Sequence, residues 1–170
     1  RRRAQAKRMF PKAVWTEIRG NVQTRLKKIA TGQADATVLA AAGLARLGIE
    51  EWEGVTFRHL TFDEMIPAVG QGAIAIQTKT EHAAFFEGKF DSETGLALEV
   101  ERMFLVALGG GCHTAFGAHY RDGRLMVFHE DTGICDFPVD VSNQAAIRDS
   151  IAHVIREIRR DRSADSENGE

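Results

Sequence analysis

The stretch Arg19-Gly20-Asn21-Val22-Gln23-Thr24-Arg25 places two arginines around a glycine and the expected start of a helix. Asn21 is a favourable N-cap residue, and Leu26 and Ile29 give the apolar stripe of a helix over residues 21–30. A helix N-terminus presents unpaired N–H groups, and arginine binds carboxylate or phosphate through a planar, charged fork. The stretch therefore predicts a site for a small, multiply anionic molecule. The alternative is a capped surface helix whose arginines are solvated.

The residues on either side of this stretch predict an α/β fold with parallel strands. The segments with the alternation or length of strands are residues 13–18, 36–40, 55–60 and 72–77. A helical turn over residues 43–47 completes an order of strand, helix, strand and helix, which indicates a parallel layer. Ligands bind beyond the carboxyl ends of such strands, where Arg19 and Gly43 fall.

The second half of the chain predicts a smaller α+β domain. Apolar side chains at helical spacing follow Asp91, a favourable cap, as far as Leu108. Asp122-Gly123 is a strong hairpin signal between two alternating segments. We expect a three-stranded antiparallel sheet and two helices, the last capped by Ser142. The expected strands are residues 116–121, 124–129 and 134–139.

Composition limits the class of protein. The 170 residues are 44% hydrophobic and carry a net charge of −2, so the chain can bury a core and does not resemble a general nucleic-acid binder. Cys112 and Cys135 give no disulfide framework, which predicts a reducing, cytoplasmic location. No apolar run approaches the ~20 residues of a membrane span. Because the chain begins with arginine, we expect a fragment, a processed chain or part of a longer protein.

Several segments, in this order and at this approximate spacing, resemble the porphobilinogen deaminase (hydroxymethylbilane synthase) family. They are Arg1-Arg2-Arg3, the Arg19–Arg25 stretch, Leu39-Ala40-Ala41-Ala42-Gly43-Leu44-Ala45-Arg46, Pro67-Ala68-Val69-Gly70-Gln71-Gly72-Ala73 and Gly109-Gly110-Gly111-Cys112. The second and fourth strings are specific, and the resemblance runs from Arg1 to about Tyr120.

The resemblance implies a division of the chain into four parts. Residues 1–66 would be the remnant of a parallel α/β, periplasmic-binding-protein-like domain, and residues 67–88 a segment that returns to the family's first domain. Residues 89–158 would form a third, α+β domain that carries the cofactor cysteine, and residues 159–170 a charged, disordered tail. Most of the family's first domain, with a catalytic aspartate in a Ser-x-Lys-Asp context, has no match here. We therefore expect an incomplete piece with little or no turnover by itself.

The resemblance also implies a cofactor and a reaction. Cys112 would hold dipyrromethane through a thioether, and four porphobilinogen units would be condensed on this primer into linear hydroxymethylbilane with release of ammonia. Cofactor binding is implied for Cys112, Arg1, Arg2, Arg19, Leu39, Ala40 and Gly43. Catalytic and substrate-binding roles are implied for Arg19 and Arg25, and a substrate-binding role near the growing chain for Arg46. Cys135 is assigned to packing.

The implied partners are porphobilinogen and the growing oligopyrrole, with no nucleic acid and no membrane. A companion N-terminal portion, or a second copy paired through exposed strand edges, would complete the fold. Two other classes stay open: a non-catalytic anion-binding α/β module that uses the same arginines, and a nucleic-acid binder that uses the basic residues 1–30. His113, His119 and His129 match no zinc spacing, and we assign no metal to them.

Overall fold

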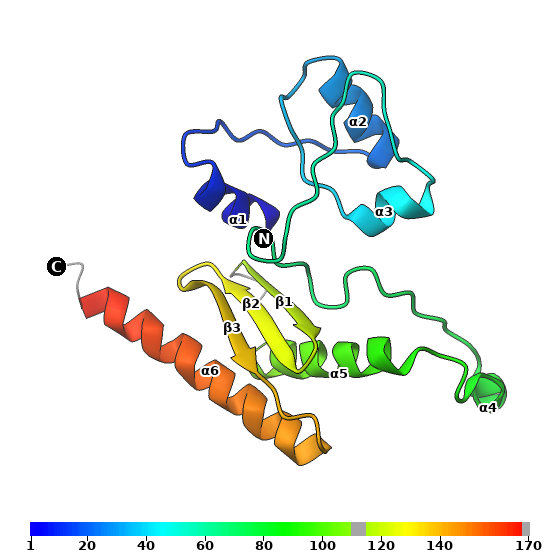
Figure 1. The fold of residues 1–170 in the computed structure, drawn as a ribbon, viewed down its shortest axis with the longest axis vertical. Coiled ribbons are helices and arrows are strands. Elements are labelled where there is room, and N and C mark those ends of the chain that lie inside the picture. The colour runs from blue at the N-terminus through cyan, green and yellow to red at the C-terminus, as the bar shows by residue number, and fades with distance from the viewer. Residues whose placement is uncertain (110–114, 168–170) are drawn as a thin grey trace. The chain divides into compact units, whose positions relative to one another are not determined.

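The computed structural model describes residues 1–109 and 115–167. They divide into two compact units, one formed by Arg2–Met65 and the other by Ile66–Glu170 together with Arg1. Figure 1 shows the elements of both units.

The first unit holds three helices joined by extended segments (Figure 1). They are α1 (Arg2–Met9), α2 (Val22–Ala30) and α3 (Ala41–Arg46). The predicted cap of α2 is confirmed, because the Asn21 Oδ1 atom accepts a hydrogen bond from the Thr24 N–H at 2.8 Å. Leu26 is the buried residue of α2, as its apolar stripe predicts.

The four predicted strands at residues 13–18, 36–40, 55–60 and 72–77 are wrong for the described part of the chain. Those segments are extended or irregular, and among the described residues the only pairing near them is an isolated bridge between Trp52 and Val55. A strand exists only where a neighbouring strand accepts and donates its backbone hydrogen bonds. These segments have the composition of strands without such a neighbour in the described residues, so no parallel layer forms among them.

The second unit contains the predicted antiparallel sheet. Its strands are β1 (Phe116–Arg121), β2 (Arg124–His129) and β3 (Gly133–Pro138), in the order β1-β2-β3. Asp122 and Gly123 form the tight turn with positive φ angles of 50° and 76°, which confirms the hairpin signal. Register pairs Ala118 with Val127 and Tyr120 with Leu125, so these four buried residues share one face.

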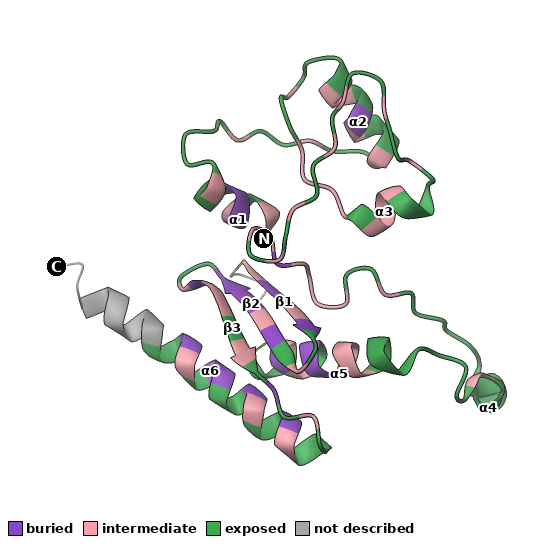
Figure 2. Cartoon of the chain, in the orientation of Figure 1, coloured by how far each residue is buried: buried purple, intermediate pink, exposed green. Residues whose placement is uncertain are grey.

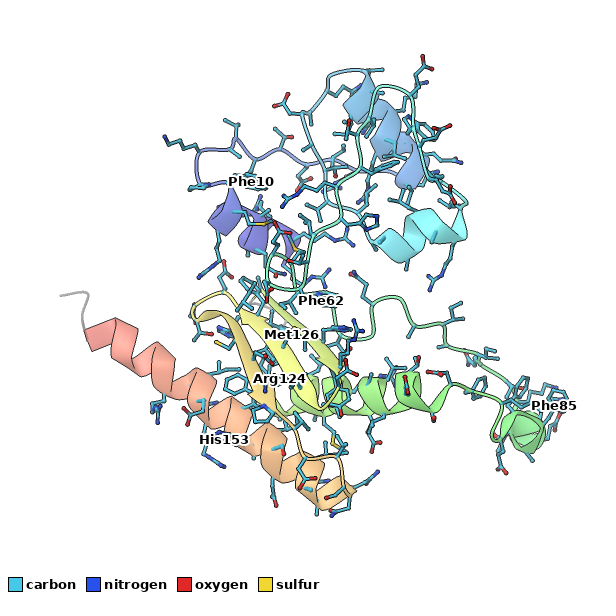
Figure 3. All side chains as sticks on the ribbon, viewed as in Figure 1. Phe10, Phe62, Phe85, Arg124, Met126 and His153 are labelled. Carbon is cyan, nitrogen blue, oxygen red and sulfur yellow. The ribbon has the colours of Figure 1, made fainter. Side chains whose placement is uncertain are left out.

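Two long helices cover that face and complete the core (Figure 2). The helix α5 (Ser92–Ala107) begins behind Asp91, whose Oδ1 atom accepts from the Thr94 N–H at 2.6 Å. The helix α6 (Gln144–Glu167) contributes an apolar stripe. The residues that α5 and α6 bury in the core are Val100, Phe104, Ile147, Ile151, Val154, Ile155 and Ile158. The short elements η1 (Thr80–His82) and α4 (Ala83–Phe86) precede α5, and α4 carries the exposed Phe85 that Figure 3 labels.

Two details of α6 differ from expectation. The cap is Asn143 rather than Ser142, because the Asn143 Oδ1 atom accepts from the Ala146 N–H at 3.0 Å. The helix also continues to Glu167, so the tail expected to be disordered from residue 159 is helical up to that residue. Charged side chains favour a helix when opposite charges lie one turn apart, as Glu157 and Arg160 do at 2.9 Å.

Candidate functional site

The turn before α2 fixes the path of the backbone between the two arginines. Gly20 has a φ of +120°, and a Cβ atom at this position would lie 2.7 Å from the Thr24 Cγ2 atom. Only glycine adopts this conformation without strain and leaves room for the capping turn. The backbone therefore enters α2 with Gly20 packed directly against Thr24.

Arg25 is held against this turn, whereas Arg19 lies at the surface. The Arg25 Nε–H donates to the Gly20 carbonyl oxygen at 2.8 Å, and the side chain is half-buried. Arg19 is exposed and forms an ion pair with Glu17 at 2.8 Å. An exposed pair of this kind is weak, so a stronger anion can displace Glu17 from Arg19.

Arg2 lies close enough to Arg25 for the two guanidinium groups to repel each other. Burial lowers the pKa of Arg2 below its ordinary value, and the charge of Arg25 lowers it further. One Arg2 N–H donates to the Val38 carbonyl oxygen at 3.3 Å. Arg2 and Arg25 thus bond to carbonyl oxygens and belong to no ion pair among the described residues. Two adjacent cations without a carboxylate partner form a site that favours an anion.

The segment after Val38 approaches the same part of this unit. Leu39 and Ala40 are half-buried and lead into α3, and the Gly43 N–H donates to the Ala40 carbonyl oxygen at 2.9 Å. A Cβ atom on Gly43 would lie 3.9 Å from the Val22 Cγ2 atom, so α3 packs closely on the first turn of α2. Arg46 is exposed at the end of α3.

The other predicted site residues are placed differently. Arg1 belongs to the second unit, where its Nη2 atom donates to the Gln71 Oε1 atom at 3.1 Å. Cys112, the expected attachment residue, and His113 lie outside the described residues. Cys135 is half-buried in β3 and packs against the core, in agreement with its assignment to packing.

Two of the three histidines considered for a metal site, His119 and His129, are described, and they lie in separate places. The His119 Nδ1 atom is 3.4 Å from the Glu101 Oε1 atom, and the buried His129 accepts from the Asp131 N–H at 3.3 Å. Among the described residues there is no group of three side chains suited to hold a metal ion.

Two polar residues of this unit were missed by the sequence analysis. Glu101 is buried beside the apolar stripe of α5, and Gln71 holds Arg1. A carboxylate next to Val100 in an apolar helix face is a visible signal, but its partners cannot be found from spacing. Gln71 lies in the specific Pro67–Ala73 string, where no spacing or pattern separates it from its neighbours.

No helix in the described part of the chain combines the length and apolar character needed to cross a membrane.

Comparison with known proteins gives consistent results. Residues 1–87 match the family model described as "Porphobilinogen deaminase, dipyromethane cofactor binding domain". The chain is similar to the porphobilinogen deaminase of Nitrobacter hamburgensis, with 48% identity over 71% of this chain and 38% of that protein. It shares 44% identity with that of Ruminiclostridium josui, over 70% of this chain and 40% of the relative.

A longer alignment covers both units. The porphobilinogen deaminase of Listeria innocua is 34% identical over 94% of this chain and 58% of its own length. The chain thus spans between about two fifths and three fifths of these relatives. Since the family model covers just over half of the residues and both units align with members, the chain belongs to the porphobilinogen deaminase family.

Proposed function

We propose that this chain is part of a hydroxymethylbilane synthase, which condenses four porphobilinogen units into linear hydroxymethylbilane and releases ammonia at each step. The observation that carries the proposal is the pair formed by Arg2 and Arg25, two close guanidinium groups that bond to carbonyl oxygens. Family membership supplies the reaction class, and the arginine pair supplies a reason to bind its substrates.

The arginine pair fits the proposed cofactor. Dipyrromethane and porphobilinogen carry an acetate and a propionate on each ring, and every carboxylate removed from water needs a charged or hydrogen-bonded partner. Burial and the charge of Arg25 lower the pKa of Arg2, and a carboxylate bound between Arg2 and Arg25 would offset the repulsion between them. The donor set of this unit therefore suits a multiply anionic oligopyrrole.

Individual residues have distinct roles in this proposal. Arg1 and Arg2 hold carboxylates of the cofactor, and Arg19 joins them once Glu17 is displaced. Arg19 and Arg25 orient porphobilinogen and the growing chain for reaction. Arg46 contacts the chain as it lengthens, and the backbone of Leu39, Ala40 and Gly43 would line the same binding site.

Cys112 is the proposed tether of the cofactor. When bound, dipyrromethane supplies the pyrrole whose free α-carbon takes up the next unit. The thiol of Cys112 contributes the sulfur of the thioether.

The proposal extends to the arrangement of the chain. Residues 1–66 are the remnant of a periplasmic-binding-protein-like domain, whose extended segments would pair with segments supplied from elsewhere. Residues 67–88 return to the first domain, and residues 89–158 form the third. Exposed apolar side chains in the returning segment, with Ile74 at 75% and Ile76 at 57% exposure, support a need for a partner strand. That strand would come from an N-terminal portion or a second copy, in the cytoplasm.

Intact mass spectrometry tests the tether. The chain is produced in a host that makes porphobilinogen, as wild type, Cys112→Ser and Cys135→Ser. We expect a covalent dipyrromethane increment on the wild type and on Cys135→Ser, and none on Cys112→Ser. An unmodified wild-type chain would favour the anion-binding module, and an increment that moved with Cys135 would refute the assignment.

A binding experiment tests the arginine pair. Calorimetry with porphobilinogen compares Arg25→Gln with Arg121→Gln, a control in which an exposed arginine paired with Asp122 is changed. Because hydrogen bonds to charged groups contribute about 1.5–3 kcal/mol, we expect Arg25→Gln to bind about ten- to a hundredfold more weakly. Equal affinities of the two variants would contradict the proposal.

A further inference from the structure

Glu101 is a charged residue buried in the second unit, with 4% of its surface exposed. It lies on α5, and each of its two carboxylate oxygens accepts a backbone hydrogen bond from a different segment. Oε2 accepts from the Gly70 N–H at 2.6 Å, and Oε1 accepts from the Tyr120 N–H at 3.0 Å. The His119 Nδ1 atom lies 3.4 Å from Oε1. One carboxylate therefore joins α5, β1 and the Pro67–Ala73 segment.

The segment that Glu101 holds is also fixed along its length. The Pro67 carbonyl oxygen accepts from the Ala118 N–H at 3.2 Å, and Val69 packs against the core. A Cβ atom on Gly117 would lie 2.7 Å from the Pro67 oxygen, so the two backbones are in direct contact. Gly70 has a φ of +68° and lies against Leu98, where a Cβ atom would be 3.0 Å from the Leu98 Cδ2 atom. The position and direction of the backbone at Gly70 are thereby determined.

The residue after Gly70 is Gln71, and it contacts Arg1, the arginine proposed to bind a cofactor carboxylate. Gln71 follows the held Gly70, its N–H donates to the Ala68 carbonyl oxygen at 2.9 Å, and its Oε1 atom accepts from Arg1. An arginine has four rotatable side-chain bonds and loses considerable freedom when it binds an anion. A guanidinium already held in place loses less, so it binds more tightly.

We propose that Glu101 is a positioning residue for Arg1, acting through Gly70 and Gln71. The carboxylate fixes Gly70 on α5 and β1, Gly70 fixes Gln71, and Gln71 orients the guanidinium that receives a cofactor carboxylate. The role assigned to Arg1 rests on the proposed function, whereas the mechanical link between Glu101 and Arg1 does not.

A carboxylate suits this position better than the neutral amide. Both oxygens of Glu101 accept from N–H groups, and glutamine would place an NH₂ donor against one of those two donors. Glu101→Gln therefore keeps the size of the side chain and breaks one of the two links. Glu99→Gln is the matched control, because Glu99 lies on the same helix and contacts the Gln144 side chain instead.

Nuclear magnetic resonance of the full chain without ligand tests the link. In Glu101→Gln we expect the Gly70 or Tyr120 amide to exchange at least about tenfold faster. The Arg1 side-chain Nε–H signal should show the same gain in mobility as in Gln71→Ala, and the double variant should show no further change. Glu99→Gln should leave all these signals unaltered. An Arg1 signal that responds to Gln71→Ala and not to Glu101→Gln would overturn the proposal.

If Glu101→Gln does not fold, amide hydrogen exchange of the wild-type chain tests the proposal instead. The Gly70 amide should then exchange as slowly as the Tyr120 amide, and exchange at the rate of an unprotected amide would overturn the proposal. Cofactor occupancy, read as the fraction of chain with the covalent increment, should fall in both Glu101→Gln and Gln71→Ala. A wild-type chain without the covalent increment would refute the proposed function. The hydrogen-exchange result would then still test the link between Glu101 and Arg1.

Discussion

Gly20 shows how much one residue contributes to the arginine site. Its φ of +120° and its approach to Thr24 leave no space for a side chain, and its carbonyl oxygen accepts the hydrogen bond of Arg25. The turn, the helix cap and the arginine therefore depend on the same glycine.

Gly20→Ala should destabilise the first unit by about 1–3 kcal/mol, because alanine is strained at this φ and its methyl group collides with Thr24. Gly43→Ala is the control, since Gly43 lies inside α3 with ordinary contact distances and alanine should stabilise a helix by about 0.5–1 kcal/mol. Trp15 and Trp52 both belong to this unit, so urea unfolding followed by tryptophan fluorescence measures both effects. Equal free energies of unfolding for the two variants would show that the turn is not strained by a side chain.

Asp91 makes the stability of α5 depend on pH. Hydrogen bonds from Thr94 hold the pKa of this carboxyl below its ordinary value of 3.8. A group whose pKa is lowered on folding stabilises the fold above its unfolded pKa, and that contribution is lost as the pH falls through the folded pKa. Asp91→Ala should lower the free energy of unfolding near neutral pH and reduce its decline between about pH 5 and pH 2.

Asp91→Asn separates the charge from the cap. Asparagine also accepts the Thr94 hydrogen bond, so this variant should stay close to the wild type near neutral pH and lack the Asp91 part of the acid-induced decline. Urea unfolding at several pH values measures both variants. A decline identical in the wild type and in Asp91→Asn would exclude this carboxyl as its source.

At the scale of elements, the sequence predicts correctly those features that interactions between residues close in the chain determine. Asn21, Asp91 and the Asp122-Gly123 turn act within a few residues, and the elements they begin or join are present. The segments at 13–18 and 36–40 need distant partners, and alternation alone does not supply them. The role of Glu101 was not predicted for the same reason, because its partners lie 31 and 19 residues away along the chain.

The helix α6 should depend strongly on its buried stripe. Ile151 is 2% exposed in the core shared by α5, α6 and the sheet, and Ile151→Ala should cost about 2–5 kcal/mol through lost burial and a residual cavity. Arg156→Ala, an exposed change on the same helix, should alter stability by about 0.5 kcal/mol or less. Chemical unfolding followed by circular dichroism compares them, and a similar loss in both would contradict the assignment of this face to the core.

At the scale of the whole molecule, the second unit combines a packed core with an exposed segment. The sheet, α5 and α6 share one core, whereas residues 74–85 are exposed and contain only short helical turns. Exposed segments with few buried contacts open easily and are the preferred sites of proteolysis.

Limited trypsin digestion should cut the second unit first at Lys79 and Lys89. These lysines lie in the exposed segment before α5, whereas Arg102, Arg124 and Arg148 lie within α5, β2 and α6. Mass spectrometry of early fragments should find a resistant piece that begins close to Asp91. Early cleavage after Arg102 or Arg124 would show instead that the core opens as readily as the segment before it.

The outer edge of β1 has a consequence for association between chains. Pro67 and Glu101 occupy the N–H groups of Ala118 and Tyr120, so a foreign strand arriving on that side finds those donors already taken. The opposite edge of the sheet is β3, which ends at Pro138, a residue without an N–H group. Addition of a strand is thereby blocked along β1 by the Pro67 carbonyl and the Glu101 carboxylate, whereas at β3 the proline removes one of the donors that an added strand would use.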